Sequence, residues 1–239
     1  MQKDDRILRA VMSVILIIAM VLWAREAAAL KTEYVWMGKA DGNFGEKNIC
    51  IVLDAGHGGR DPGKVGTTGC YEKDINLKIT EKLKMFLEME GIEVILTRDG
   101  DYGLYSETDT NKKMADMQNR IRLIEEKAPE LTVSLHQNSY SDGSIKGAQT
   151  FYFSGSDESR ELAGYIQERL VCTLDEKNHR KEKVNDSYYL LKNTTGPIVI
   201  VECGFLSNDA ECKLLETDYY REKVAWAIYM GIMRYLNAK

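Results

Sequence analysis

The stretch Ile51-Val52-Leu53-Asp54-Ala55-Gly56-His57-Gly58-Gly59 joins an apolar run to a glycine-rich turn that carries a histidine. The apolar run, over residues 48–53, is too short for a helix and is bounded by glycine, which predicts a buried strand. Glycine lets the backbone turn sharply and approach a ligand closely. The stretch therefore predicts a buried strand that ends in a turn suited to binding a ligand.

Strand and helix patterns alternate along the rest of the chain. Further strands are predicted over residues 92–97, 131–136, 147–153, 187–191 and 197–202. Helices are predicted from a cap at Asp74 to about Glu90, across Met114 to Ile124, after Ser156 through Leu170, and across Val224 to Tyr235, because their apolar residues recur every three or four positions. This alternation predicts a single α/β domain with a largely parallel twisted sheet and helices on both faces.

Two of the chain's three histidines, His57 and His136, stand at the ends of predicted strands, and Glu202 ends another. In open parallel sheets, ligands bind at the carboxyl ends of the strands. Glu72 follows His57 by fifteen residues, just before a predicted helix. Two histidines and one glutamate form a ligand set of catalytic zinc sites, with a fourth position open to water. The pattern therefore predicts a metallohydrolase.

Each of these residues also has a structural interpretation. His57 would then belong to a plain turn, Glu72 would favour the start of a helix through the helix dipole, and His136 would be a core histidine bonded to the backbone. The joint placement of the three residues favours ligation. The remaining histidine, His179, lies in a charged stretch and is predicted to be a solvated surface residue.

Glu202 ends a six-residue apolar strand, where a carboxylate costs free energy unless it is paired, ligated or catalytic. Partial burial would raise its pKa, as a general base requires. The alternative is an ion pair with an arginine or lysine. Arg98 and Arg120 are candidate partners, or clamps for a substrate carboxylate. Structural salt bridges explain both arginines equally well.

Other classes of function lack their sequence signals. The glycine run is not a dinucleotide-binding motif, because the histidine occupies its tight turn, and no Gly-Lys-Ser/Thr phosphate loop exists. The His-Glu-x-x-His signature of many zinc peptidases is also absent. The net charge of −5 and the lack of a basic tract argue against nucleic acid as a partner.

The N-terminus has the pattern of a targeting segment. Residues 10–24 carry no charge and are bracketed by Arg9 and Arg25, with Lys3 and Arg6 upstream. We interpret residues 1–29 as a signal peptide or a membrane anchor, residues 30–47 as a linker, and residues 48–239 as the catalytic domain. Cleavage and retention of the segment stay open at this point, and either predicts an exported chain.

The five cysteines, at positions 50, 70, 172, 203 and 212, show no disulfide framework. Cys50 and Cys203 fall in apolar strands and are expected to be buried small hydrophobes. A bridge between Cys203 and Cys212 and a competing ligand role for Cys70 beside Glu72 are the alternatives that their positions leave open.

Several motifs together resemble the zinc-dependent N-acetylmuramoyl-L-alanine amidases of the amidase-3 type. They are Leu53-Asp54-Ala55-Gly56-His57-Gly58-Gly59, Tyr71-Glu72-Lys73-Asp74, Leu96-Thr97-Arg98, Ser134-Leu135-His136-Gln137-Asn138 and Val201-Glu202-Cys203-Gly204-Phe205-Leu206-Ser207-Asn208. The resemblance covers about residues 49–236. It implies one Zn²⁺ per chain on His57, Glu72 and His136, a catalytic Glu202, and peptidoglycan as the substrate. Separately from the resemblance, we predict Asn138, Arg98 and Arg120 as substrate contacts. Ala55 and Gln137 depart from the family's commoner residues without removing a ligand.

The short chain, its N-terminal apolar segment and Gly103-Leu104-Tyr105-Ser106 look most like the germination-specific, spore-cortex members of that family. Those members strip whole peptides from muramic acid so that muramic-δ-lactam can form. The resemblance implies an enzyme on the cell-wall side of a spore-forming bacterium, secreted or held at the membrane. An inactive wall-binding scaffold and another exported zinc amidohydrolase or peptidase are the alternatives. No residue pattern indicates whether an accessory protein is needed.

Overall fold

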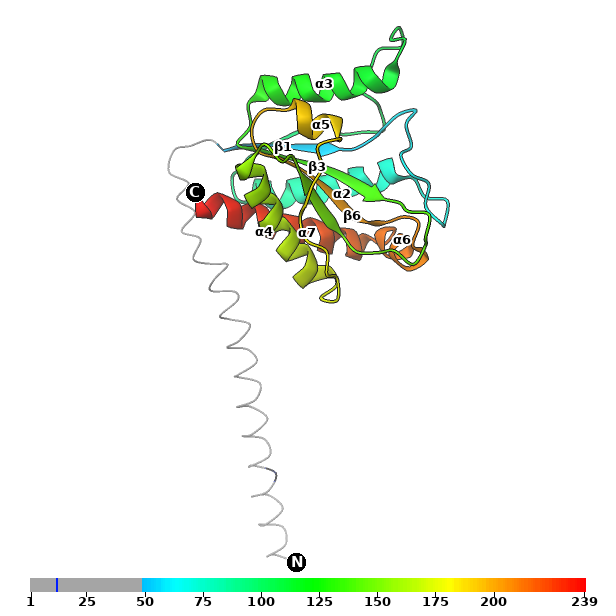
Figure 1. Ribbon diagram of the computed structural model, residues 1–239, viewed down its shortest axis with the longest axis vertical. Coiled ribbons are helices and arrows are strands. Elements are labelled where there is room, and N and C mark those ends of the chain that lie inside the picture. The colour runs from blue at the N-terminus through cyan, green and yellow to red at the C-terminus, as the bar shows by residue number, and fades with distance from the viewer. Residues whose placement is uncertain (1–11, 13–48) are drawn as a thin grey trace, which may run out of the picture. The chain divides into compact units, whose positions relative to one another are not determined.

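The computed structural model describes Met12 and residues 49–239, and the chain from Asn48 to Lys239 forms one compact unit (Figure 1). The predicted targeting segment and linker, residues 1–47, lie outside the described residues except for Met12. Within the described part of the chain, no helix is both long and apolar enough to cross a membrane.

A six-stranded mixed sheet runs through the unit, in the order β2-β1-β3-β6-β4-β5. The strands are β1 (Cys50–Ala55), β2 (Glu93–Leu96), β3 (Leu131–Asn138), β4 (Gln149–Tyr152), β5 (Lys183–Val184) and β6 (Ile198–Phe205). The pairs β2–β1, β1–β3 and β3–β6 are parallel, whereas β4 runs antiparallel to β6. The prediction of a largely parallel sheet in an α/β domain is confirmed.

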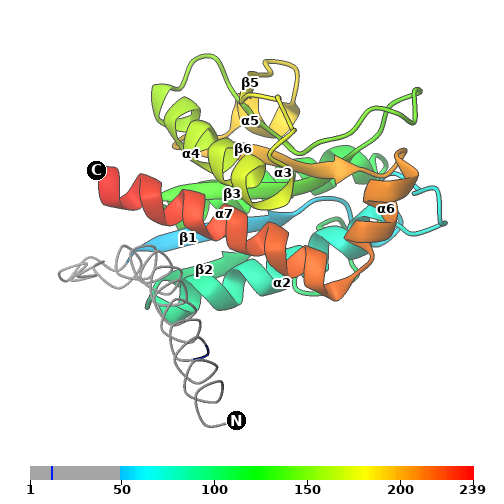
Figure 2. The same cartoon turned by 90° about the horizontal axis from the view of Figure 1, so that it is seen from below.

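Helices cover both faces of the sheet, as predicted. The described helices are α2 (Glu72–Met89), α3 (Lys112–Lys127), α4 (Asp157–Leu174), α5 (Tyr189–Asn193), α6 (Asp209–Leu215) and α7 (Asp218–Ala238). Helices α2, α4 and α7 pack on one face, and α3 and α5 lie on the other (Figures 1 and 2). Because both faces are covered, β1 and β6 contain continuous buried apolar runs, over residues 51–53 and 198–201, rather than alternating patterns.

Of the two helix starts that the sequence predicts with a cap, the one at Ser156 is confirmed. The Ser156 hydroxyl caps α4 by accepting a hydrogen bond from the Ser159 amide, and the Asn111 side chain caps α3 in the same way. Helix α2 begins at Glu72, two residues before the predicted cap at Asp74. Glu72 is therefore the first residue of a helix rather than a residue that precedes one.

The prediction of a short strand over residues 187–191 is wrong, because the segment forms the end of a turn and the start of α5. The Asn185 side chain accepts hydrogen bonds from the backbone amides of Ser187 and Tyr188, which closes a turn before the helix. Leu190 and Leu191 are both buried. One turn of helix places both leucines in the same apolar cluster, with Ile124 of α3 and Ile200 of β6.

Candidate active site

His57 lies in the turn after β1, where its backbone adopts a left-handed conformation with φ of 63°. Its Nδ1 is 2.9 Å from the Asp61 carboxylate, and its backbone carbonyl accepts a hydrogen bond of 2.7 Å from Arg120 Nη2. Both contacts fix the orientation of the ring and leave Nε2 directed at Glu72, 3.2 Å away. A carboxylate on the far nitrogen of a ligating histidine is a recurrent arrangement in metal sites.

Glu72, at the start of α2, places its carboxylate between the two histidines. Its Oε1 is 3.0 Å from His136 Nδ1, and the backbone amides of Lys64 and Gln137 donate to its two oxygens at 2.8 and 3.0 Å. The side chain is only 2% exposed. Burial opposes the charged form, but the hydrogen bonds from His136 and His57 outweigh it and hold the pKa of Glu72 well below its usual range.

His136 and Glu202 lie side by side on β3 and β6, as register partners of the two parallel strands. Glu202 is 7% exposed, and burial raises its pKa above the ordinary value. The Tyr188 hydroxyl, from the segment before α5, donates to Oε1 at 3.3 Å. Oε2 has no hydrogen-bond partner among the described residues. A buried carboxylate oxygen without a partner at the wall of a pocket suits a proton acceptor.

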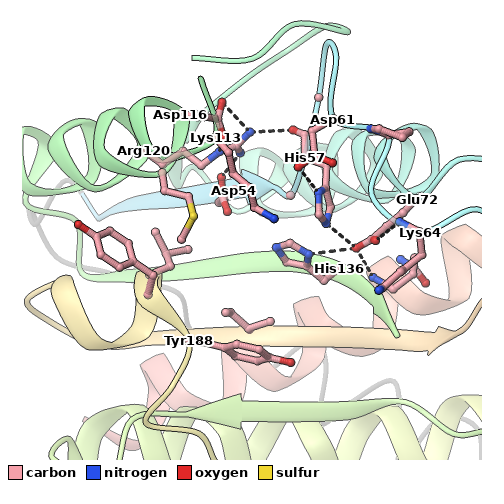
Figure 3. Close-up of a pocket in the computed structure, with 18 of the residues that line it drawn as sticks. Asp54, His57, Asp61, Lys64, Glu72, Lys113, Asp116, Arg120, His136 and Tyr188 are labelled. Carbon is pink, nitrogen blue, oxygen red and sulfur yellow. Dashed lines mark hydrogen bonds and ion pairs between the residues drawn. The ribbon is translucent and has the colours of Figure 1, made fainter. Parts of the chain in front are cut away.

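The side chains of His57, Glu72 and His136 fit a metal ion. Each offers one ligand atom, and these atoms lie within 4.8 Å of one another. The two imidazole rings meet edge to face, with centroids 5.0 Å apart, and Figure 3 shows both directed at the Glu72 carboxylate. Two imidazoles and one carboxylate match the protein ligands of catalytic zinc sites. The cluster opens into a cavity of about 690 Å³, which Glu202, Tyr188 and Asn138 also line.

The two arginines that the sequence offered as partners of Glu202 bind elsewhere. Arg98 is 1% exposed and donates to the backbone carbonyls of Ala55, Gly56, Lys73 and Gly100. Arg120 pairs with Asp54 at 2.6 Å and Asp116 at 2.7 Å. Both guanidinium groups thus hold the loops around the site, which leaves Asn138 as the candidate substrate contact with the most open position.

The structure also bears on the two alternatives for the cysteines, a Cys203–Cys212 bridge and a ligand role for Cys70. Cys203 is buried in β6, and its Sγ lies 3.6 Å from the Val201 carbonyl, so no bridge joins it to Cys212. Cys70 lies beside Cys212 rather than in the histidine cluster. His179 is exposed and lines a second pocket together with Lys146 and Asp175. That pocket shares no lining residue with the cavity at the histidine cluster.

Asp61 and Tyr188 are the two site residues that sequence reasoning did not single out. Asp61 follows His57 by four residues in the same glycine-rich turn, and that spacing is the signal that was available. Tyr188 reaches Glu202 from a segment whose structure the sequence pattern did not predict.

An α/β sheet that holds two histidines and a glutamate at its carboxyl edge, next to a buried second glutamate, defines a metal-dependent hydrolase. Residues 51–234 match the N-acetylmuramoyl-L-alanine amidase family Amidase_3, and the chain belongs to that family. The predicted resemblance is thereby confirmed.

Individual relatives agree with this assignment. The germination-specific N-acetylmuramoyl-L-alanine amidase of Bacillus subtilis (strain 168) is 39% identical over 192 residues, which cover 79% of this chain and 80% of that protein. The solved CwlD amidase of Clostridioides difficile, in complex with the GerS lipoprotein, is 45% identical, with a TM-score of 0.78 and coverage of 80% of this chain and 100% of that one. The amidase AmiC2 of Nostoc punctiforme is 29% identical, with a TM-score of 0.70 and coverage of 81% and 99%.

Proposed function

We propose that the chain hydrolyses the amide bond between the lactyl group of muramic acid and L-alanine in peptidoglycan. The observation that carries this proposal is the pairing of a three-ligand cluster with a buried glutamate whose Oε2 has no partner. The cluster and the glutamate line one cavity, and His136 and Glu202 come from neighbouring strands of the sheet. Membership of the amidase family supplies the substrate class.

His57, Glu72 and His136 would hold Zn²⁺, which, when bound, polarises a substrate carbonyl and makes water a stronger acid. The rest of the chemistry belongs to the chain's own residues. Asp61 holds the His57 ring so that its Nε2 faces the Glu72 carboxylate. Glu202 accepts the proton of the attacking water and delivers it to the leaving amine of L-alanine. Burial raises the pKa of Glu202, which makes its carboxylate a stronger proton acceptor.

The cavity wall suits a substrate that combines sugar and peptide. Tyr105 and Tyr189 offer aromatic surfaces, and Lys112 and Lys113 offer positive charge for peptide carboxylates. Asn138, the last residue of β3, lies on the same wall, two positions after His136. We assign Asn138 to substrate binding, and Arg98 and Arg120 to positioning of the surrounding loops.

Product analysis tests the proposal. The full chain, loaded with zinc and incubated with peptidoglycan, should release peptides with a free N-terminal L-alanine and leave peptide-free glycan. His136→Ala should abolish the release. A peptidase would shorten peptides that stay attached to muramic acid, and an inactive scaffold would bind peptidoglycan without releasing any peptide. Either result would contradict the amidase proposal.

We further propose a role in the spore cortex, where peptide removal precedes formation of muramic-δ-lactam. The support is the similarity to the germination-specific amidase of Bacillus subtilis and to CwlD of Clostridioides difficile. Export to the cell-wall side, with the N-terminal segment as signal peptide or membrane anchor, belongs to the same proposal. Cortex from spores that lack this chain should contain no muramic-δ-lactam. A normal lactam content would contradict the cortex role alone and leave the amidase activity in place.

An accessory partner is a separate proposal, which rests on the solved complex of the Clostridioides difficile amidase with the GerS lipoprotein. We expect peptide release by this chain to increase when a lipoprotein homologous to GerS from the same organism is added. Equal release with and without that protein, at saturating zinc, would contradict it.

A further inference from the structure

Cys70, Cys212 and Glu216 form a second cluster of metal-ligand side chains, separate from the histidine cluster. The two sulfur atoms are 3.5 Å apart, although the residues are separated by 142 positions in sequence. One ligand atom from each of the three residues lies within 4.8 Å of the others. Cys212 is buried, whereas Glu216 is exposed, so the cluster has one side inside the fold and one side open to solvent.

The backbone around the cluster is built closely onto the sulfurs. The turn before α2 is held by a hydrogen bond from the Gly66 amide to the Cys70 carbonyl and by another from Thr67 to the Leu206 carbonyl. A Cβ atom at Gly66 would lie 2.6 Å from both sulfurs, so only glycine fits there. The Thr68 hydroxyl is 3.3 Å from Cys212 Sγ. The turn is therefore packed directly against both sulfur atoms.

The ligands come from two segments that adjoin, in sequence, the elements carrying Glu72 and Glu202. Cys70 lies two residues before Glu72 and the start of α2. Cys212 lies within α6, and Glu216 is the residue at its C-terminal cap, one helical turn further on. Residues four apart on a helix share a face, so Cys212 and Glu216 both address the turn that carries Cys70. Figure 2 shows α6 beside this turn.

The spacing and the donor types define the kind of ion. In a tetrahedral zinc site with Zn–S bonds of about 2.3 Å, two sulfur ligands lie roughly 3.8 Å apart. The observed sulfur–sulfur distance of 3.5 Å is close to the distance between two ligands of such a site. It is much longer than the sulfur–sulfur bond of a disulfide, which is about 2.0 Å. Thiolates select thiophilic ions over calcium and magnesium, which take oxygen ligands. Cys70, Cys212 and Glu216 supply three ligands, and the exposed side of the cluster at Glu216 leaves a fourth position accessible to water.

We propose that Cys70, Cys212 and Glu216 bind a thiophilic divalent cation such as Zn²⁺ at a second, structural site. The ion fastens the turn that leads into Glu72 to α6, which follows the strand carrying Glu202. It takes no part in the hydrolysis, and the proposal does not depend on the chain's substrate. Its effect is to tie the turn that precedes Glu72 to the helix that follows the Glu202 strand.

Cobalt distinguishes this site from the histidine cluster, because only a thiolate-bound Co²⁺ gives an intense thiolate-to-metal absorption band in the near ultraviolet. The full chain, reduced and freed of metal, should develop this band as Co²⁺ is added at micromolar concentration. The chain with both His57→Ala and His136→Ala should bind one equivalent fewer and keep the band. Cys70→Ser and Cys212→Ser should each lose it. Cys172→Ser, at an exposed thiol outside the cluster, is the matched control and should keep it.

Thermal unfolding supplies a second readout. In the His57→Ala, His136→Ala background, Zn²⁺ should raise the unfolding midpoint, because an ion that binds only the folded chain stabilises it. Adding Cys212→Ser should remove that rise. If a serine variant fails to fold, Glu216→Gln retains both thiols and should need more Co²⁺ to develop the band. An absent band in the reduced chain, a band that survives Cys212→Ser, or a Cys70–Cys212 disulfide in the isolated chain would each overturn the proposal.

Discussion

At the scale of single residues, the two buried glutamates of the site are expected to do different work. Glu72 lies between the histidines and accepts two backbone amides, whereas Glu202 has only the Tyr188 hydroxyl on one oxygen. Glu202→Gln keeps the shape but cannot accept a proton, so it should retain zinc and lose about 10²–10⁴-fold in turnover. Glu72→Gln should weaken zinc binding first, because it removes a ligand charge. Zinc content and peptide release, measured for both variants, check this division.

Two results would contradict the roles proposed for Glu72 and Glu202. A Glu202→Gln chain without zinc, or one with near-normal turnover, would mean that the roles of the two glutamates are assigned wrongly. Tyr188→Phe is a useful companion, because it removes the hydrogen bond to Oε1 while leaving the carboxylate in place.

Zinc binding should depend on pH through His57. Burial opposes the charged imidazole, but hydrogen bonds to Asp61 and Glu72 outweigh it and raise the pKa of His57 in the metal-free chain to about 9. Zinc must displace that proton at any pH below this value. Apparent affinity should therefore fall by about tenfold for each pH unit of acidification below the pKa. Competition with a chelator between roughly pH 6 and pH 9 measures the slope.

Asp61→Asn is the control for this titration. Because it removes one of the two carboxylates that raise the pKa of His57, the pH at which affinity begins to fall should move down. A flat zinc affinity over the whole range in the unaltered chain would contradict the argument.

Gly56 illustrates how a residue without a side chain can set the geometry of the site. A Cβ atom at this position would lie 2.3 Å from the His136 ring. Gly56→Ala should therefore displace a ligand and abolish zinc binding, although the backbone at Gly56 needs no left-handed conformation. Gly164→Ala, in α4, meets nothing within 4 Å and should keep full zinc content. Metal analysis of the two purified variants separates a local clash from a general effect of replacing glycine.

The same residues show what sequence can and cannot predict at this scale. His57, His136 and Glu202 stand out because a charged or polar side chain at the end of an apolar strand has few structural uses. Asp61 and Tyr188 do not stand out in this way. Their roles depend on the left-handed turn at His57 and on a turn before α5, and both bring together groups that the chain pattern does not relate.

At the scale of elements, one buried ion pair joins β1, β3 and α3 beneath the site. The Asp54 carboxylate accepts hydrogen bonds from Arg120 at 2.6 Å, Ser134 at 2.6 Å and Thr97 at 2.7 Å. Burial alone would raise the pKa of Asp54, but the charge of Arg120 and the two hydroxyls lower it to about 2. Because Arg120 also donates to the His57 carbonyl, the pair connects the packing of α3 to the position of His57, a proposed metal ligand.

Asp54→Asn should destabilise the chain by about 1–3 kcal/mol, because the buried Arg120 guanidinium loses one of its two carboxylate partners and keeps only Asp116. Denaturant unfolding at neutral pH measures the loss. The stabilisation by Asp54 is present above the unfolded-state pKa of about 4 and is lost as pH falls toward about 2, so the two chains should converge on acidification. Glu107→Gln, at an exposed pair with Arg60, is the control, and a similar loss there would contradict the argument.

Elements were predicted well where apolar periodicity was long and poorly where it was short. Helices α2, α4 and α7 each present several apolar residues at helical spacing. Helix α6 has seven residues and was not predicted, although Asn208 caps it by accepting from the Glu211 amide. Strand β5 has two exposed residues and exists only through pairing with β4, which no local pattern reports.

At the scale of the whole unit, alternating strands and helices predicted the class of fold but not the order of the strands. The antiparallel β4 shows the limit most clearly. No helix separates β4 from β3 along the chain. Because parallel neighbouring strands need a crossover connection, the missing helix indicates that the direction of the chain reverses at β4. The pairing of β4 with β6 rather than with β3 depends on contacts between distant segments.

The unit from Asn48 to Lys239 contains its own core, which predicts that it folds without the N-terminal segment. The buried apolar residues of the described chain begin at Ile51 in β1 and extend to Leu236 in α7. A chain that lacks residues 1–47 should therefore unfold cooperatively, bind zinc and release peptides as the full chain does. It should also fractionate apart from membranes if the removed segment is the signal or anchor. Removing residues 1–55 is the control, because it deletes a strand hydrogen-bonded on both sides and should prevent folding. Calorimetry and zinc analysis of the shorter chain would contradict the argument if it proved unfolded or metal-free.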